Sequence, residues 1–266
     1  MLHVALWVLG RVGGRTAAAA LTAGAVLAGP PDVAAQDRPV ELELVLAVDA
    51  SASVQRDEFD LQVRGLAQAF RHPAVLAALD ALDGREVAVT VVQWSSPGRQ
   101  HVAIPWMRIG DRAGAAALSA KLARMPRYVT SGGTATGQAI AFARGLFGAN
   151  GYRGARRVID VSGDGRANMG RHPSAARDDA AAAGVTINGL AILNEEKNVD
   201  RYYAEHVIGG PGAFLMTAAD YGAFARAIRR KLVREITGSG IAALPGGPEP
   251  RSRIVGRSGR EAAAVP

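Results

Sequence analysis

Residues 42–53 read LELVLAVDASAS, an almost continuous apolar run that ends in an acid and two serines. Such a run is typical of a strand that is buried on both faces at the centre of a parallel sheet. Residues 56–70 follow, with apolar side chains every three or four positions from Phe59 to Phe70, the spacing of one face of a helix. A buried strand followed directly by an amphipathic helix predicts an α/β fold.

The same alternation continues along the chain. Further strands are predicted at 87–94, 101–107, 157–161 and 185–193, with a short edge strand at 214–217. Helices are predicted at 112–124, 136–147, 173–183 and 221–236. Two Arg-His-Pro triplets, beginning at Arg71 and Arg171, are interpreted as helix starts, because proline suits the first helical turn. We therefore expect one Rossmann-like α/β domain, with a doubly wound, mostly parallel sheet and helices on both faces.

The composition is that of a globular protein without cysteine. Of the 266 residues, 48% are hydrophobic and 21% are charged. The absence of cysteine excludes disulfides, zinc–cysteine sites and a thiol nucleophile. The net charge of +7 raises the question of nucleic-acid binding. However, all but three of the 31 basic residues are arginine, a bias that genome composition also produces, and we do not expect a nucleic-acid partner.

The first 35 residues have the features of a bacterial export signal. Arg11 and Arg15 precede an apolar run at 16–28, and small residues at 33–35 suit cleavage. The run is shorter than the roughly 20 residues that span a bilayer, so no stable membrane span is expected after cleavage. An uncleaved anchor is the alternative, because the residues before Arg11 are also apolar.

The other end of the chain, residues 238–266, is rich in Gly, Pro, Ser and Arg and is expected to be a disordered tail. Of the net charge of +7, this tail carries +2 and the signal carries +1, which leaves +4 on residues 36–237. We therefore expect one domain at 36–237, located in the periplasm or secreted.

Three loops that follow predicted strands or precede a helix carry oxygen-bearing side chains: Asp49, Ser51, Ser53, Thr134 and Asp164. Alone, each of these residues would also fit a helix cap or a turn. Together they lie where ligands bind in open α/β sheets, at the carboxyl ends of the strands. Oxygen ligands with two carboxylates suit Mg²⁺ or Mn²⁺. The sequence therefore predicts a metal site, with Thr136 as an alternative to Thr134 in the same loop.

These residues resemble the metal-ion-dependent adhesion site (MIDAS) of the von Willebrand factor type A (vWA) domain. Asp49, Ser51 and Ser53 match its Asp-x-Ser-x-Ser element, and Thr134 and Asp164 match its later Thr and Asp-Gly elements. The resemblance covers about residues 41–236 and is greatest to exported bacterial members without an established function. It implies direct metal contacts by the two serines and Thr134, with both aspartates acting directly or through water. Before Asp164, the pair Ser-Gly departs from the bulkier residue and Thr of many relatives.

The resemblance implies a non-enzymatic module whose bound ion, Mg²⁺ or Mn²⁺, captures an Asp or Glu of a protein partner. A metal-dependent phosphohydrolase is the first alternative, because an aspartyl nucleophile can also follow a first strand. Enzymes of the haloacid-dehalogenase type need a second Asp two positions on, where this chain has Ser51, and a P-loop is absent. The second alternative is a metal-free structural or interaction domain.

Overall fold

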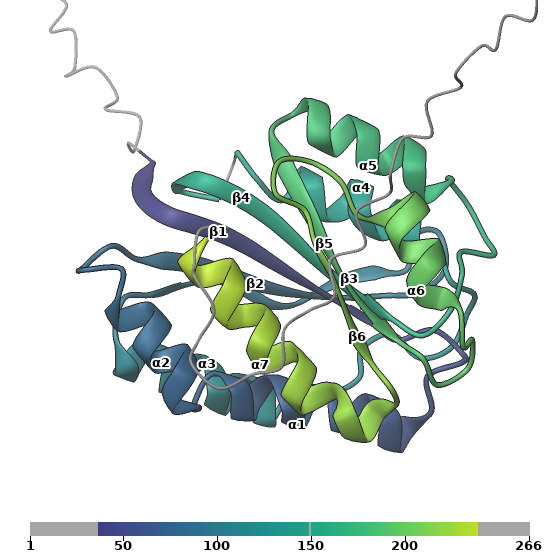
Figure 1. Cartoon of the computed structure of the whole chain (residues 1–266), viewed down its shortest axis with the longest axis horizontal. Helices are drawn as coiled ribbons and strands as arrows, with labels where there is room; N and C mark the ends of the chain where they lie inside the picture. The colour runs from purple at the N-terminus through teal and green to yellow at the C-terminus, as the bar shows by residue number, and fades with distance from the viewer. Residues whose placement is uncertain (1–36, 149, 239–266) are drawn as a thin grey trace, which may run out of the picture. The chain divides into compact units, whose positions relative to one another are not determined.

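The computed structural model describes residues 37–148 and 150–238, which form a six-stranded sheet between two layers of helices (Figure 1). The strand order is β3-β2-β1-β4-β5-β6, and every neighbouring pair is parallel except β2 and β3. The strands are β1 (Arg38–Asp49), β2 (Val87–Trp94), β3 (Gln100–Ile109), β4 (Tyr152–Gly163), β5 (Val185–Ile192) and β6 (Leu215–Ala218). The predicted doubly wound, mostly parallel sheet is confirmed. The predicted signal and the tail beyond Gly238 lie outside the described residues.

Helices cover both faces of this sheet. One face carries α1 (Arg56–Ala69), α2 (Pro73–Asp80), α3 (Arg112–Ala123) and α7 (Tyr221–Thr237). The other carries α4 (Thr136–Gly145), α5 (Pro173–Ala182), α6 (Val199–Tyr202) and the π-helical turn η1 (Tyr203–Val207). Within the described residues, none of these helices has the length and hydropathy needed to cross a membrane.

The predicted elements agree with the observed ones to within a few residues at most ends. The two Arg-His-Pro triplets do begin helices, and their histidines are the N-caps: His72 accepts from the amide of Ala74 and His172 from that of Ser174. The pair α6 and η1 was not predicted, because it is short and has no repeated apolar pattern.

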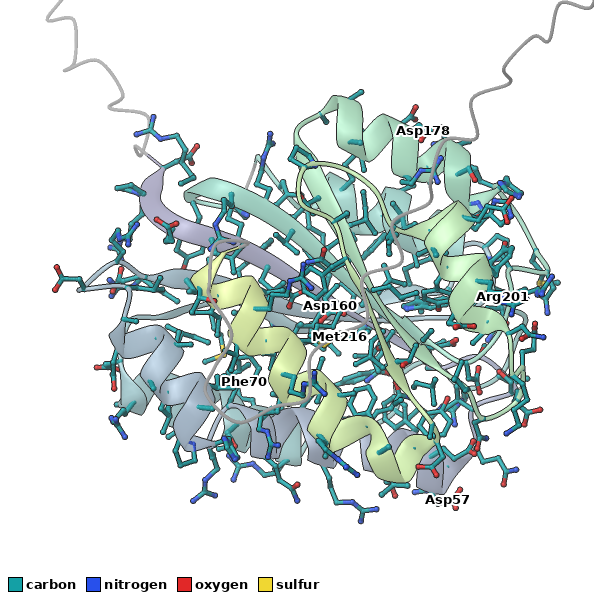
Figure 2. The ribbon with its side chains drawn as sticks, in the orientation of Figure 1. Asp57, Phe70, Asp160, Asp178, Arg201 and Met216 are labelled. Carbon is teal, nitrogen blue, oxygen red and sulfur yellow. The ribbon has the colours of Figure 1, made fainter. Side chains whose placement is uncertain are left out.

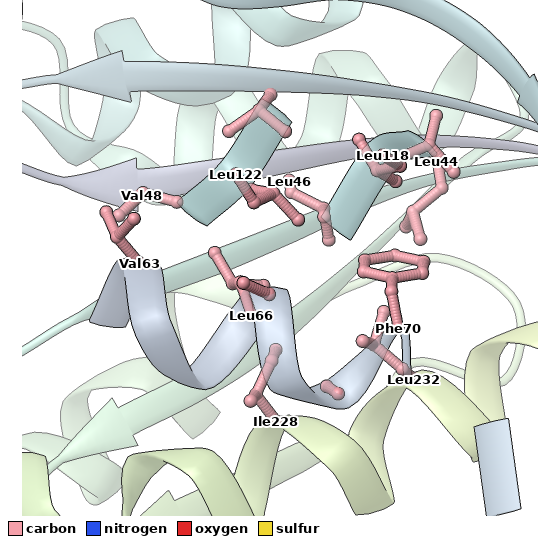
Figure 3. Close-up of a cluster of buried hydrophobic side chains, with 14 of the residues drawn as sticks. Leu44, Leu46, Val48, Val63, Leu66, Phe70, Leu118, Leu122, Ile228 and Leu232 are labelled. Atoms are coloured by element: carbon pink, nitrogen blue, oxygen red, sulfur yellow. The ribbon is translucent and has the colours of Figure 1, made fainter. Parts of the chain in front are cut away.

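The central strand β1 organises the core because its alternate side chains point to opposite faces. Leu44, Leu46 and Val48 pack into the cluster formed with α1, α3 and α7 (Figure 3). Val45 and Ala47 belong to a second cluster on the opposite face. Both faces of β1 are therefore covered, which explains its nearly continuous apolar sequence.

A buried ionic cluster lies between the sheet and α7. Lys231 is fully buried, and its Nζ lies 2.7 Å from Asp160 Oδ1 and 2.7 Å from Glu235 Oε1. Asn188 also donates to Glu235 Oε1 at 2.9 Å. Figure 2 shows Asp160 in the interior, in contrast to surface carboxylates such as Asp57. Burial, together with the charge of Glu235, raises the pKa of Asp160 above its ordinary value, against the opposing effect of Lys231.

We expect Lys231→Met to lower the free energy of unfolding by about 3–5 kcal/mol at pH 8, because it leaves buried carboxylates without their cation. Lowering the pH to 5 should recover part of this loss, because protonated carboxyl groups no longer need a positive partner. Chemical denaturation measures both values.

The matched control is Arg230→Met on the exposed side of the same helix, which should change stability by less than about 0.5 kcal/mol. A Lys231→Met protein as stable as the wild type at pH 8 would contradict the role given to this lysine.

Candidate functional site

The register of the sheet places the loops that follow β1 and β4 side by side. Val48 pairs with Ser162, so Asp49 and Asp164 lie at the carboxyl ends of two neighbouring strands, at the same end of the sheet. Ser53 in the first loop donates from its Oγ to Asp164 Oδ1 at 2.8 Å, across 111 positions of sequence. A direct hydrogen bond therefore joins the two loops.

Within the first loop, Asp49 and the two serines form a continuous series of hydrogen bonds. The amide of Ser51 donates to Asp49 Oδ1 at 2.8 Å, and Ser51 Oγ lies 3.1 Å from Ser53 Oγ. With the bond from Ser53 to Asp164, four of the five residues predicted for the site are connected in one cluster. Asp49, Ser51 and Asp164 are buried, and Ser53 is partly exposed.

The fifth predicted residue, Thr134, lies beside this cluster without joining it. Its loop is held to the first loop by a bond from the amide of Ala52 to the carbonyl of Gly132 at 2.8 Å. The amide of Thr134 donates to Asn168 Oδ1 at 2.8 Å, but in the described structure its hydroxyl does not hydrogen-bond to the other four residues. The alternative, Thr136, begins α4, and its hydroxyl is buried with no partner among the described residues.

The sequence analysis did not identify Arg127, which fixes the backbone of the first loop. Its guanidinium donates to the carbonyl oxygens of Ala50 at 2.8 Å, Ser51 at 3.0 Å and Val54 at 3.0 Å. It also donates to the carbonyl oxygen of Val129, in its own loop, at 3.0 Å. Three bonds from one rigid planar group thus bind the backbone of the first loop, and the fourth anchors the guanidinium to its own loop. Nothing in the local sequence separates Arg127 from the other arginines.

The two aspartates lie in an environment that disfavours their charged forms. Burial and the charge of Asp164 raise the pKa of Asp49 to about 7, although hydrogen bonds from Ser51 act in the opposite direction. Burial also raises the pKa of Asp164, against the hydrogen bond from Ser53. Oδ2 of each aspartate is buried and has no hydrogen-bond partner among the described residues. A cation at this edge would therefore stabilise both carboxylates.

The glycine before Asp164 leaves space that this arrangement requires. A Cβ added at Gly163 would lie 2.5 Å from the hydroxyl of Tyr203 and 2.8 Å from Asp49 Oδ2. Tyr203 is fully buried in η1, and its hydroxyl has no partner within the described part of the chain. π-helical turns are rare and often occur at functional sites. The Ser-Gly departure seen in the sequence thus has a packing reason, which Tyr203 supplies.

We expect Gly163→Ala to lower the free energy of unfolding by about 1–3 kcal/mol, because the added methyl overlaps a carboxylate and a buried hydroxyl. Gly165→Ala is the matched control two residues along, where the nearest atom to an added Cβ is Glu196 Oε1 at 3.7 Å. Thermal and denaturant unfolding of both variants test this, and equal stabilities would contradict the tight packing at Gly163.

Doubly wound topology, helices on both faces and a cluster of hydroxyls and carboxylates after the first strand define the chain as a protein of the vWA fold. The chain is similar to proximal thread matrix protein 1 from the mussel byssus, with a TM-score of 0.56 and 18% identity over 76% of this chain and 48% of that one. Another structure of that protein is described as having a zinc-occupied MIDAS motif. Its TM-score is 0.52 and its identity 15%, over 76% of this chain and 49% of that one. For a von Willebrand factor type A protein from Catenulispora acidiphila, the TM-score is 0.50 and the identity 18%, over 74% of this chain and 43% of that one.

The present chain thus spans about half the length of these structures, and the likeness concerns the fold. Residues 39–240 match the family model DUF1194, described as a protein of unknown function, and the chain belongs to this family. A search of curated proteins gave no match.

Proposed function

We propose that this DUF1194 protein is an exported, non-enzymatic vWA-type module that binds Mg²⁺ or Mn²⁺ and, through the ion, a carboxylate of a protein partner. The proposed ligands, direct or through water, are Asp49, Ser51, Ser53, Thr134 and Asp164. One observation carries the proposal: a hydrogen bond joins two loops far apart in sequence and brings together two buried aspartates, each with one carboxylate oxygen that has no hydrogen-bond partner among the described residues.

The chemistry of these side chains supports a hard divalent cation. All five offer oxygen atoms, which Mg²⁺ and Mn²⁺ prefer over nitrogen or sulfur. In the described structure the hydroxyl of Thr134 makes no hydrogen bond to the other four residues, so no such bond would have to break for it to bind an ion. If one aspartate acts through water, the ion keeps positive character and attracts a carboxylate from outside.

Two observations support the non-enzymatic and exported parts of the proposal. In the described residues no histidine hydrogen-bonds to Asp49 or Asp164, so the site lacks an imidazole general base. The apolar run after Arg11 and Arg15 has the features of an export signal.

Calorimetric titration of the chelator-treated full chain with Mg²⁺ and Mn²⁺ tests the metal site. We expect binding to the wild type and a loss of affinity of about 10–100-fold in Asp164→Asn, which removes a charge and a ligand oxygen. The control is Asp80→Asn, an exposed aspartate at the end of α2 whose partner is Arg112.

No binding at millimolar metal, or equal affinity in wild type and Asp164→Asn, would contradict the site and favour a metal-free domain. The partner's chemistry is tested with the same proteins as bait. A protein retained by the wild type in Mg²⁺, and released by chelator or by Asp164→Asn, is the expected result.

Metal affinity should rise as the pH increases from 6 to 8. The pKa of Asp49 is about 7 in the metal-free protein, and a metal ligand must be ionised, so protons compete with the ion below this pH. We expect about a tenfold weaker affinity per pH unit below 7 and proton release on binding near pH 6.5. Calorimetry in buffers of different ionisation enthalpy measures both, and an affinity that is constant from pH 6 to 8 would contradict the assignment of Asp49.

The stability of the metal-free protein should fall as the pH rises, whereas metal affinity should rise. The folded state keeps the proton of Asp49 up to a pKa of about 7, whereas the unfolded chain loses it near 3.8. The contribution of this group to the free energy of unfolding is therefore largest below pH 3.8 and falls as the pH rises through 7. Added Mg²⁺ should reverse this loss above pH 7, since a ligand that binds the native state stabilises it.

A further inference from the structure

A cavity of about 240 Å³ lies at the opposite end of the sheet from the aspartate cluster. It is bounded by the first halves of β4 and β5, the segment before β6 and the end of α7. Its lining includes Arg156, Arg157, Thr186, Phe214 and Arg234. The volume is somewhat below the ~300–1,000 Å³ of pockets for drug-sized ligands, so the cavity suits a smaller molecule.

Arg234 contributes an available guanidinium to this cavity. Its Cζ lies 3.9 Å from the centre of the Phe214 ring, so the flat face of the group is stacked on the aromatic ring. Among the described residues it forms no ion pair and no hydrogen bond, in contrast to the buried Lys231 three positions earlier. Stacking fixes the plane of an arginine and leaves its N–H donors free for a planar or tetrahedral anion.

Two further arginines line the cavity, and among the described residues one of them, Arg157, forms no ion pair. Arg157 donates from Nη2 to the carbonyl of Ala183 at 2.6 Å, and its other donors have no acceptor within the described chain. Arg156 also lines the cavity, but it donates to the carbonyls of Glu235 and Ile236, at 2.8 and 2.9 Å, and its Nε lies 3.6 Å from Glu41 Oε1, so its charge is already paired.

The carboxylate in the lining, that of Glu235, does not offset this charge. Its Oε1 accepts from Lys231 at 2.7 Å and from Asn188 at 2.9 Å, inside the buried ionic cluster. Lys231 also pairs with Asp160, so the buried cluster carries at most one net negative charge, and the two charges of Arg157 and Arg234 exceed it and give the cavity a positive potential.

We propose that this cavity binds a small anion that carries a carboxylate or phosphate group, with Arg234 as the principal donor and Arg157 as the second. Both groups present oxygen atoms at the spacing that a guanidinium contacts with two parallel N–H bonds. The site is independent of the proposed metal site, because it uses other residues at the other end of the sheet.

Calorimetric titration of the full chain with succinate and with inorganic phosphate, in the presence of chelator, tests the proposal. Chelator removes divalent ions, so the result does not depend on the metal site. We expect at least one probe to bind, and Arg234→Gln to weaken it by about tenfold or more, as expected for a lost charged hydrogen bond. Succinamide, which has the shape of succinate without its charge, should not bind.

Arg230→Gln is the matched control, because it removes an exposed arginine one turn earlier on α7 and outside the cavity lining. Arg230→Gln should leave the affinity for the anion unchanged. Arg157→Gln, in which Arg234 is retained, should weaken binding. Binding of succinate alone or of phosphate alone supports the proposal and assigns the anion's class. Absence of binding by both at millimolar concentration, or equal affinities in wild type and Arg234→Gln, would overturn it.

Discussion

Burial of β1 is the constraint on which the rest of the structure depends. A strand with apolar residues on both sides of its chain needs a hydrogen-bonded neighbour at each edge and a helical layer over each face. β2 and β4 are these two neighbours, and both run parallel to β1. Parallel neighbours require crossover connections, and their carboxyl ends lie at the same end of the sheet. Asp49 and Asp164 therefore come together as a consequence of how β1 is buried.

This dependence explains which features the sequence could predict. The strands, most helices and the residues Asp49, Ser51, Ser53 and Asp164 carry local signals, because each follows or lies within a periodic apolar segment. Arg127, Tyr203 and Lys231 have no such signal. Their roles come from contacts with residues distant in sequence, and Lys231 looks like Arg230 until the packing of α7 shows that one is buried and the other exposed.

The arginine excess has a structural role in the part of the chain that the structure describes. Arg127 binds carbonyls of the loop after β1, and Arg156 binds the last carbonyls of α7, which have no partner within the helix. Others pair with carboxylates at the surface, as Arg108 does with Glu86. Part of the basic composition that suggested nucleic acid thus serves to bind oxygen atoms of the protein itself.

Two pairs of buried carboxyl groups in the described part of the chain differ in how their charge is compensated. Asp160 and Glu235 have a cation of their own, since Lys231 lies 2.7 Å from each. In the described structure Asp49 and Asp164 form no ion pair with a lysine or arginine, and the hydrogen bonds that they receive come from uncharged groups of Ser51 and Ser53. Because buried charge is stable only when it is compensated, the second pair needs either a proton or an external cation. This contrast within one molecule is a physical argument for the proposed divalent ion that does not depend on any relative.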